Sequence, residues 1–390
     1  MNELEVIDRA WQQYQECVRR AGATLRSPGY PTDPRLRAEG YRYLGRITQL
    51  AQQIYVEFGS STHPMLFRYG DDVTAFGASN TDNNYYRAPV NCDGHYRVYG
   101  NTHNAREILF SVQDGEFVFG KTQVLAECAL SELIVDADGT FELLLGGEPR
   151  PHNWLPLPAG TEYLNVREFV ADWEHDGLAV LNIEHVNVDT PPAPLTALGL
   201  ATALGKAGAW VERSIATWHQ YALAIRSTAP TNHMPPPTRP AGSANHMLHG
   251  GCQWSLAADE ALLIEFELPT ASYWSMQNYV IDWMQPLDFV NRVTSLNNRQ
   301  VHVDCDHRVR LVVAHEDPGV QNWLDTSELP NGLTSYRYVN PRHAPTPQAK
   351  VVKLGQLPSH LPSDTPRFTA AERHAQVTRR RAGIARRFRR

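Results

Sequence analysis

The stretch from Ser272 to Leu329 combines tryptophans with many titratable and amide side chains. Within it His315 and Asp317 stand two residues apart, a spacing that places both side chains on one side of a strand. A histidine and a carboxylate in a partly dry pocket can move protons to and from a bound substrate. We therefore predict an acid–base site with His315, Asp317 and Asp325 as its catalytic residues.

Other side chains of this stretch and of the N-terminal half are candidates for holding the substrate. The indoles of Trp274 and Trp323 suit a flat ligand of mixed polarity, and Arg292 suits an anionic group. A structural role stays open for each of them, because Asp288 and Arg292 can form an ion pair and Trp323 can close one end of a sandwich. The predicted substrate-binding set is Trp274, Gln277, Asp288, Arg292, Asn297, Asn322, Trp323, Tyr86 and Arg97.

Other kinds of site have weaker support. Gly115–Thr122 satisfies the phosphate-loop pattern GxxxxGK[ST], but its middle is β-rich and no long helix is predicted after it. His246 and His249 form one pair of potential metal ligands and His315 with Asp317 another, yet no three-ligand spacing is complete. No Gly-x-Ser-x-Gly elbow is present for a serine nucleophile. We expect no cofactor and no metal, and keep a metal-dependent enzyme as an alternative.

Composition narrows the class of protein. The 390 residues are 42% hydrophobic and 20% charged, which is typical of a globular chain. No apolar run reaches the roughly 18 residues of a membrane-spanning helix. The N-terminus lacks the basic start and apolar block of a secretory signal, and the five cysteines form no CxxC pair. We expect a soluble cytoplasmic protein without a transmembrane segment.

Charge is unevenly distributed along the chain. Residues 369–390 hold eight arginines and one glutamate, a local charge of +7, so the rest of this chain of net charge −6 carries −13. Such an acidic body does not suit nucleic acid, and we expect no nucleic-acid partner. The Arg-rich segment opens with Thr369 and Glu372 in capping-box spacing, which predicts a helix. We expect this helix to dock on the acidic body or on a second subunit, so a homo-oligomer stays open.

Hydrophobic periodicity predicts a mainly β chain with added helices. Helices are expected at 3–20 and 34–58, and a third at 195–227, interrupted near Gly205 and Gly208. The predicted strands are 95–99, 107–112, 133–135, 141–145, 163–170, 178–186, 252–256, 262–268, 273–282, 300–304 and 308–315. Short strands separated by turn residues indicate an antiparallel sandwich.

Five segments follow from this pattern. We predict an N-terminal helical segment (1–70), a first antiparallel β region (71–190) and a helical, Pro-rich connector (191–243). A second β region (244–345) and an extended tail with the Arg-rich helix (346–390) complete the chain.

Several of these stretches resemble a bacterial family catalogued as domain of unknown function 1214. The resemblance is strongest at YWSMQ (273–277), LDFVNRVTSLNNRQ (287–300) and AHEDPGVQNWLDT (314–326). It extends to TDNNYYRAPV (81–90) and covers most of the chain. It implies a jelly-roll-like antiparallel β-sandwich with N-terminal helices and a C-terminal basic helix, and supplies no reaction or catalytic residue. Members often have proline where this chain has Thr81.

We therefore expect a protein with a pocket for a small organic molecule. The leading hypothesis is a cofactor-independent hydrolase or lyase that uses the His315 and Asp317 side chains as its acid–base pair. The alternatives are a non-catalytic small-molecule-binding or scaffold protein and a metal-dependent enzyme. A pocket lined by convergent polar groups favours an enzyme, whereas polar groups that bind one another favour the scaffold.

Overall fold

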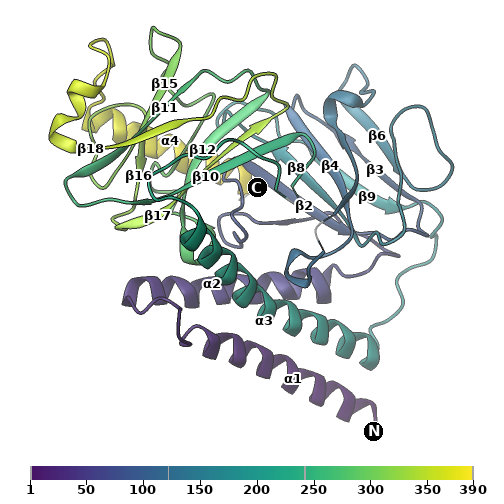
Figure 1. Cartoon of the computed structure of the whole chain (residues 1–390). Coiled ribbons are helices and arrows are strands. Elements are labelled where there is room, and N and C mark those ends of the chain that lie inside the picture. Colours follow the sequence, from purple (N-terminus) through teal and green to yellow (C-terminus); the bar gives the residue numbers. More distant parts are fainter. Residues whose placement is uncertain (1, 122, 241–242, 389–390) are drawn as a thin grey trace. The chain divides into compact units, whose positions relative to one another are not determined.

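The computed structural model describes residues 2–121, 123–240 and 243–388. Figure 1 labels the helices and strands of the chain, which divides into two compact units. Unit 1 comprises Met1–Phe76, Asn84–Phe169 and Gly177–Tyr221, and unit 2 comprises Gly77–Asn83, Val170–Asp176 and Ala222–Arg390. Among the described residues, no helix has the length and apolar character needed to cross a membrane.

Unit 1 contains two sheets that share one core. The first has the order β1–β2–β8–β4–β5, made of Phe67–Tyr69, Asn83–Pro89, Tyr163–Phe169, Glu107–Gln113 and Val124–Ala129. The second has the order β7–β6–β3–β9, made of Trp154–Leu155, Thr140–Leu145, Tyr96–Asn101 and Val180–His185. Phe110 and Val166 of the first sheet belong to one buried cluster with Val98 and Leu143 of the second. Alternating side chains thus fill a sandwich interior.

The three helices that precede residue 230 begin close to their predicted starts. Asn2 and Glu5 form a capping box before α1 (Glu3–Thr24), and Asp33 caps α2 (Pro34–Gln52), which ends in the π-helical turn η1 (Gln53–Glu57). The predicted interruption of the third helix is wrong, because α3 runs unbroken over Ala197–Thr228. A Cβ on Gly208 would lie 3.1 Å from Cys17 of α1, so this glycine permits close helix packing instead of a break.

Unit 2 repeats the two-sheet plan. One sheet has the order β10–β17–β12–β13 with β14 beside β12, made of Met247–Ser255, Asn331–Val339, Tyr273–Val280, Gln285–Pro286 and Ser295–Asn297. The other has the order β16–β15–β11–β18, made of Trp323–Asp325, Arg308–Ala314, Glu260–Glu267 and Gln348–Lys353. Phe266 of β11 meets Trp274 of β12 edge to face, with ring centroids 5.4 Å apart. All described strand pairs are antiparallel except β6–β7 and β15–β16.

Short 3-10 helices and one long C-terminal helix complete the chain. The short ones are η2 (Phe117–Phe119), η3 (Leu130–Glu132), η4 (Ile281–Trp283) and η5 (Leu354–His360). Helix α4 (Ala370–Phe388) begins at the predicted capping box, where Thr369 N donates to Glu372 Oε2 at 2.7 Å and Glu372 N to Thr369 Oγ1 at 3.3 Å.

The predicted fold class is confirmed: the chain is mainly β, its sheets are open and largely antiparallel, and helices are added. The jelly-roll strand order and the five-segment division stay predictions. Two predicted strands are wrong, since 133–135 and 300–304 have no strand pairing. The segment after Gly115 forms η2 and then β5 rather than a long helix, although Thr122 lies outside the described residues.

Candidate functional site

Three arginines form a buried stripe along α4. Arg373, Arg380 and Arg387 are spaced seven residues apart, close to two helical turns, so they share one face of the helix. Their exposed fractions are 7%, 4% and 0%, although arginine is almost never buried without partners. Each of the three therefore needs a set of acceptors, which we call its socket.

The socket of Arg373 lies in the segment that most resembles the family. Its Nε and Nη2 donate to the two carboxylate oxygens of Asp317 at 2.9 and 3.1 Å, and Nη2 also donates to Val320 O at 2.6 Å. Its guanidinium lies 4.9 Å from the ring centroid of Trp323. A bidentate carboxylate with an aromatic face is a strong arginine site, so Asp317 and Trp323 hold α4.

Among the described residues, the socket of Arg380 contains no bonded carboxylate. Its guanidinium donates to Ser295 O at 3.0 Å, Ser295 Oγ at 2.7 Å and Phe289 O at 3.2 Å. It also stacks 4.5 Å from the Trp173 ring centroid. Burial lowers the pKa of Arg380 to about 10, an effect that the charge of Asp82 opposes. The side chain stays cationic at neutral pH despite its dry surroundings.

Arg387, the last arginine of the stripe, contacts the start of the family-like segment 81–90. Its guanidinium donates to the backbone oxygens of Thr81 at 2.9 Å and Asn83 at 3.0 Å. Its charge also lies 5.1 Å from the Trp173 ring centroid. A Cβ on Gly383 would lie only 2.7 Å from Trp173 Cβ, so this glycine lets the helix approach the indole. The segments 81–83, 289–295 and 317–323 thus each hold one arginine of α4.

The two residues predicted as an acid–base pair have separate partners. The Nδ1 of His315 lies 2.7 Å from Thr326 Oγ1, and its Nε2 lies 3.2 Å from Leu256 O. Asp317 instead bonds Arg373 and the backbone N–H of Gly319. Both ring nitrogens of His315 are therefore engaged within the protein fold.

Asp325 and Arg292 do come together, at the edge of unit 2. Arg292 Nη1 donates to Asp325 Oδ2 at 3.1 Å, and its Nη2 donates to Glu328 Oε1 at 3.0 Å. Burial raises the pKa of Asp325 in spite of the Arg292 charge and the Ser327 N–H bond. Ser327 and Glu328 both adopt positive φ, of 53° and 62°, a costly conformation for two consecutive non-glycine residues.

Gln277 belongs to a buried polar network. Its members Asn80, Asp82 and Tyr273 were not among the predicted site residues. Gln277 Nε2 donates to Asn80 Oδ1, and Tyr273 Oη donates to Asp82 Oδ2 at 2.5 Å. Burial, reinforced by the Asp82 carboxylate, raises the pKa of Tyr273, so this phenol remains a donor. Thr81 N donates to Gln277 Oε1 at 3.1 Å, a bond that a proline at this position could not make.

The remaining predicted residues of unit 2 serve mainly backbone groups. Asn297 Nδ2 donates to Ala171 O at 2.9 Å, and Trp323 Nε1 donates to Ala314 O at 3.0 Å. Asp288 accepts from the backbone of Asn291 at 3.0 Å, and Trp274 is only 2% exposed in the core. These contacts give each of the four side chains a partner or a packing place within the fold, and their role in substrate binding stays a prediction.

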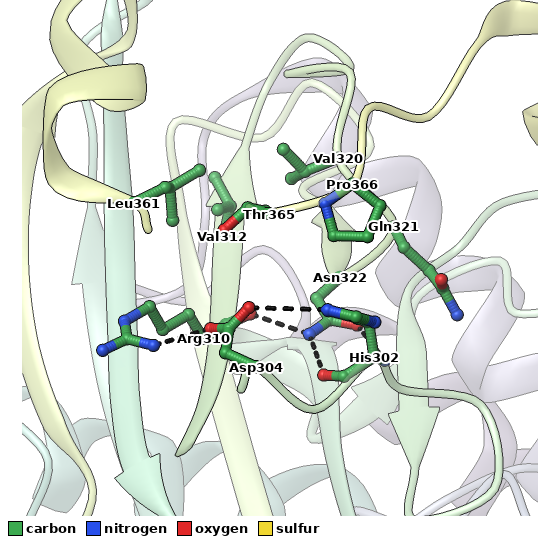
Figure 2. A pocket seen from close by; sticks show the side chains of 10 residues that line it. All are labelled: His302, Asp304, Arg310, Val312, Val320, Gln321, Asn322, Leu361, Thr365 and Pro366. Carbon is green, nitrogen blue, oxygen red and sulfur yellow. Dashed lines mark hydrogen bonds and ion pairs between the residues drawn. The ribbon is translucent and has the colours of Figure 1, made fainter. Parts of the chain in front are cut away.

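Asn322 lines a small polar pocket of unit 2, shown in Figure 2. Its Nδ2 donates to His302 O at 2.7 Å, while Asp304 bonds Arg310 at 2.6 Å across the pocket wall. The free space is about 10 Å³, roughly that of one water molecule. This pocket is too small for an organic substrate.

Tyr86 and Arg97 belong to unit 1, whereas the other predicted site residues belong to unit 2. Arg97 pairs with Glu142 at 3.2 Å and Glu184 at 2.9 Å, and Tyr86 Oη accepts from Arg68 at 3.1 Å. The Arg97 ion pairs are typical of the exposed side of a sheet, whereas the Tyr86 side chain packs against the buried core cluster of unit 1. In the described part of the chain, no group of three or more His, Cys, Asp or Glu side chains is arranged to hold a metal.

The chain matches one family model and is similar to solved structures. Residues 237–343 match the model of a family described as protein of unknown function (DUF1214). The crystal structure of an uncharacterised protein from Burkholderia cenocepacia is similar, with 30% identity, a TM-score of 0.84, and coverage of 91% of this chain and 99% of that one.

A more remote likeness has a lower score. The VPA0106 protein from Vibrio parahaemolyticus has 12% identity and a TM-score of 0.46, with coverage of 80% of this chain and 98% of that one. No curated protein matches the chain.

Proposed function

We propose, from the premise that the chain belongs to the bacterial DUF1214 family, that it is a non-catalytic binding or scaffold protein. The observation that carries the proposal is the arginine stripe of α4. The family-like segments 81–83, 289–295 and 317–323 contribute the acceptors and aromatic faces that hold Arg387, Arg380 and Arg373. In this reading the motif builds a rigid receptor for the chain's own last helix.

Burial energetics support this reading. A buried charge is retained in a fold only when its hydrogen bonds are met, and breaking such a site costs about 3–5 kcal/mol. Asp317 therefore has a structural reason to be acidic, because it neutralises Arg373 at 2.9 Å. His315 likewise has a structural reason to be a histidine, since one ring nitrogen can donate to Leu256 O while the other meets Thr326 Oγ1.

A double-mutant cycle on Asp317 and Arg373 tests the proposal. If Asp317 serves α4, Asp317→Ala and Arg373→Ala each lower the free energy of unfolding, and the double variant loses clearly less than the sum of the two. Arg379→Ala is the matched control, because Arg379 lies on the same helix with its side chain 54% exposed. Urea denaturation provides the energies. An Asp317→Ala variant as stable as the unaltered protein would contradict the proposal.

Asp325 favours a second candidate function, a cofactor-independent hydrolase or lyase. A carboxyl group whose pKa is raised by burial beside a half-exposed arginine suits a general acid next to an anionic substrate group. Incubating the protein with a bacterial metabolite extract tests this candidate by mass spectrometry. Time-dependent loss of a metabolite that Asp325→Asn abolishes, while Arg379→Ala retains it, would support catalysis and displace the scaffold reading.

A further inference from the structure

The outer face of α1 carries an apolar and charged strip that has no cover in the described chain. Leu4 is 73% exposed and Trp11 is 49% exposed, both unusually high for large apolar side chains. Steps of three and four residues place them on one helix face with Asp8, Gln15 and Arg19. We call Leu4, Asp8, Trp11, Gln15 and Arg19, all exposed, the α1 strip.

The strip has an asymmetry of charge. Its N-terminal part carries Asp8, with Glu3 and Glu5 in the same first turns, and its C-terminal part carries Arg19, whose side chain is 68% exposed. Arg19 donates from Nε and Nη2 to the two carboxylate oxygens of Glu16 at 2.6 and 2.7 Å, and its exposed Nη1 is the group that can meet a further acidic side chain. A helix that is acidic at one end and basic at the other complements a copy of itself running antiparallel.

We propose that the α1 strip is the interface of a homodimer, in which two α1 helices pack antiparallel about a twofold axis that passes between Trp11 and Gln15. In this register Asp8 of one copy lies opposite Arg19 of the second copy, and the reverse pair repeats the contact. The two Trp11 indoles meet beside the axis.

Each feature of the strip has a place in this arrangement. Tryptophan near the centre of an interface is a frequent energetic anchor because it buries a large area at low conformational cost. The flanking ion pairs fix the antiparallel direction, because a parallel pairing would bring Asp8 against Asp8 and Arg19 against Arg19. An isologous contact of this kind closes as a dimer and does not propagate into a fibre.

Sedimentation equilibrium of the full-length protein over a range of concentrations tests the dimer. Trp11→Ala is expected to raise the dissociation constant about a hundredfold. Asp8→Arg alone and Arg19→Asp alone are each expected to raise it about tenfold, since the axis repeats each repulsion twice. The double variant Asp8→Arg with Arg19→Asp is expected to restore it, because the swapped charges attract again.

Arg9→Asp is the matched control, since it makes the same charge change on the opposite flank of α1 and should leave the dissociation constant unchanged. Circular dichroism confirms that each variant is folded. A chain that stays monomeric at all concentrations would overturn the proposal, as would a dimer that ignores both single swaps. Binding of the monomer to phosphatidylglycerol vesicles would assign the strip to a membrane surface and would equally overturn it.

Discussion

Helices α1 and α4 are similar in length, with 22 and 19 residues, but α4 buries charged side chains and α1 does not. The buried residues of α1 are Ala10, Tyr14 and Ala21, whereas α4 buries Arg373, Arg380 and Arg387 beside Gly383 and Ile384. The difference lies in what each helix meets. Helix α1 packs against side chains such as those beside Gly208 of α3, whereas α4 meets loops and strand ends that present free carbonyls. Arginines repeated along one face of a helix can therefore indicate a buried face, as repeated leucines do.

Introducing an arginine on the buried face of α1 should break this comparison most severely. Ala21 is fully buried. An arginine at this position would have neither the space nor the hydrogen-bond acceptors that surround the buried arginines of α4. Ala21→Arg is expected to lower the free energy of unfolding by about 4 kcal/mol or more. Urea denaturation gives the value. A loss below about 1 kcal/mol would show that any buried helix face here tolerates a charge.

Removing the central arginine of α4 should have the next largest effect. Arg380→Ala leaves Ser295 O and Phe289 O without their donor and opens a cavity against Trp173. We expect a loss of about 3 kcal/mol in the free energy of unfolding. Arg380→Met fills the space without the charge and separates packing from hydrogen bonding. An Arg380→Met variant as stable as the unaltered protein would mean that the charge of Arg380 contributes nothing to the free energy of unfolding.

Gly383 tests how closely α4 must pack against its neighbours. A side chain at this position would clash with Trp173, whose Cβ would lie 2.7 Å from the new Cβ. Gly383→Val is expected to cost about 1–3 kcal/mol because the helix must move away from the indole. Differential scanning calorimetry measures the change. The exposed Ala382→Val on the neighbouring position is the control and should change stability far less.

Asp325 provides a prediction in pH. Its folded-state pKa lies above the ordinary value of 3.8, so the folded state binds its proton more tightly than the unfolded state. Stability from this group is therefore lost as pH rises from about 3.8 through the folded pKa. Asp325→Asn is expected to flatten that part of the pH–stability curve, measured by urea denaturation at successive pH values. A steeper curve in the variant would contradict the sign.

The smallest effect is expected at the solvent side of α4. Arg379 lies 3.6 Å from Glu174, and its side chain is 54% exposed. Arg379→Ala should change the free energy of unfolding by less than about 0.5 kcal/mol, because water screens such a pair. Thermal unfolding of this variant beside Arg380→Ala compares two adjacent arginines of one helix. Equal losses would show that burial does not decide the role of these arginines.

Much of the fold was predictable because local signals dominate it. The caps at Asp33 and Thr369 mark helix starts through a single side-chain bond, and alternating apolar residues mark most strands. The predictions failed where tertiary contacts override a local preference. Gly208 reads as a helix breaker in isolation, yet α3 continues through it because α1 packs there.

The candidate site was less predictable, for a different reason. The unusual residues were found, including Asp317, Trp323 and Asn297, but their partners lie far away in the sequence. Arg373 is 56 residues from Asp317, and Arg387 is 306 residues from Thr81. A signal was present in the spacing of Arg373, Arg380 and Arg387, which continues over two steps of seven residues, whereas Arg379 and Arg386 share only one such step.

By itself the sequence determined the class of fold, the starts of its helices and the segments whose polar residues need partners. Those properties depend on neighbours within a few positions along the chain. Only the tertiary structure decided that Asp317 faces Arg373 and that Asp82 faces Tyr273. Residue type states that a charge or hydroxyl must be satisfied, whereas the identity of its partner depends on which distant segments folding brings within about 3 Å.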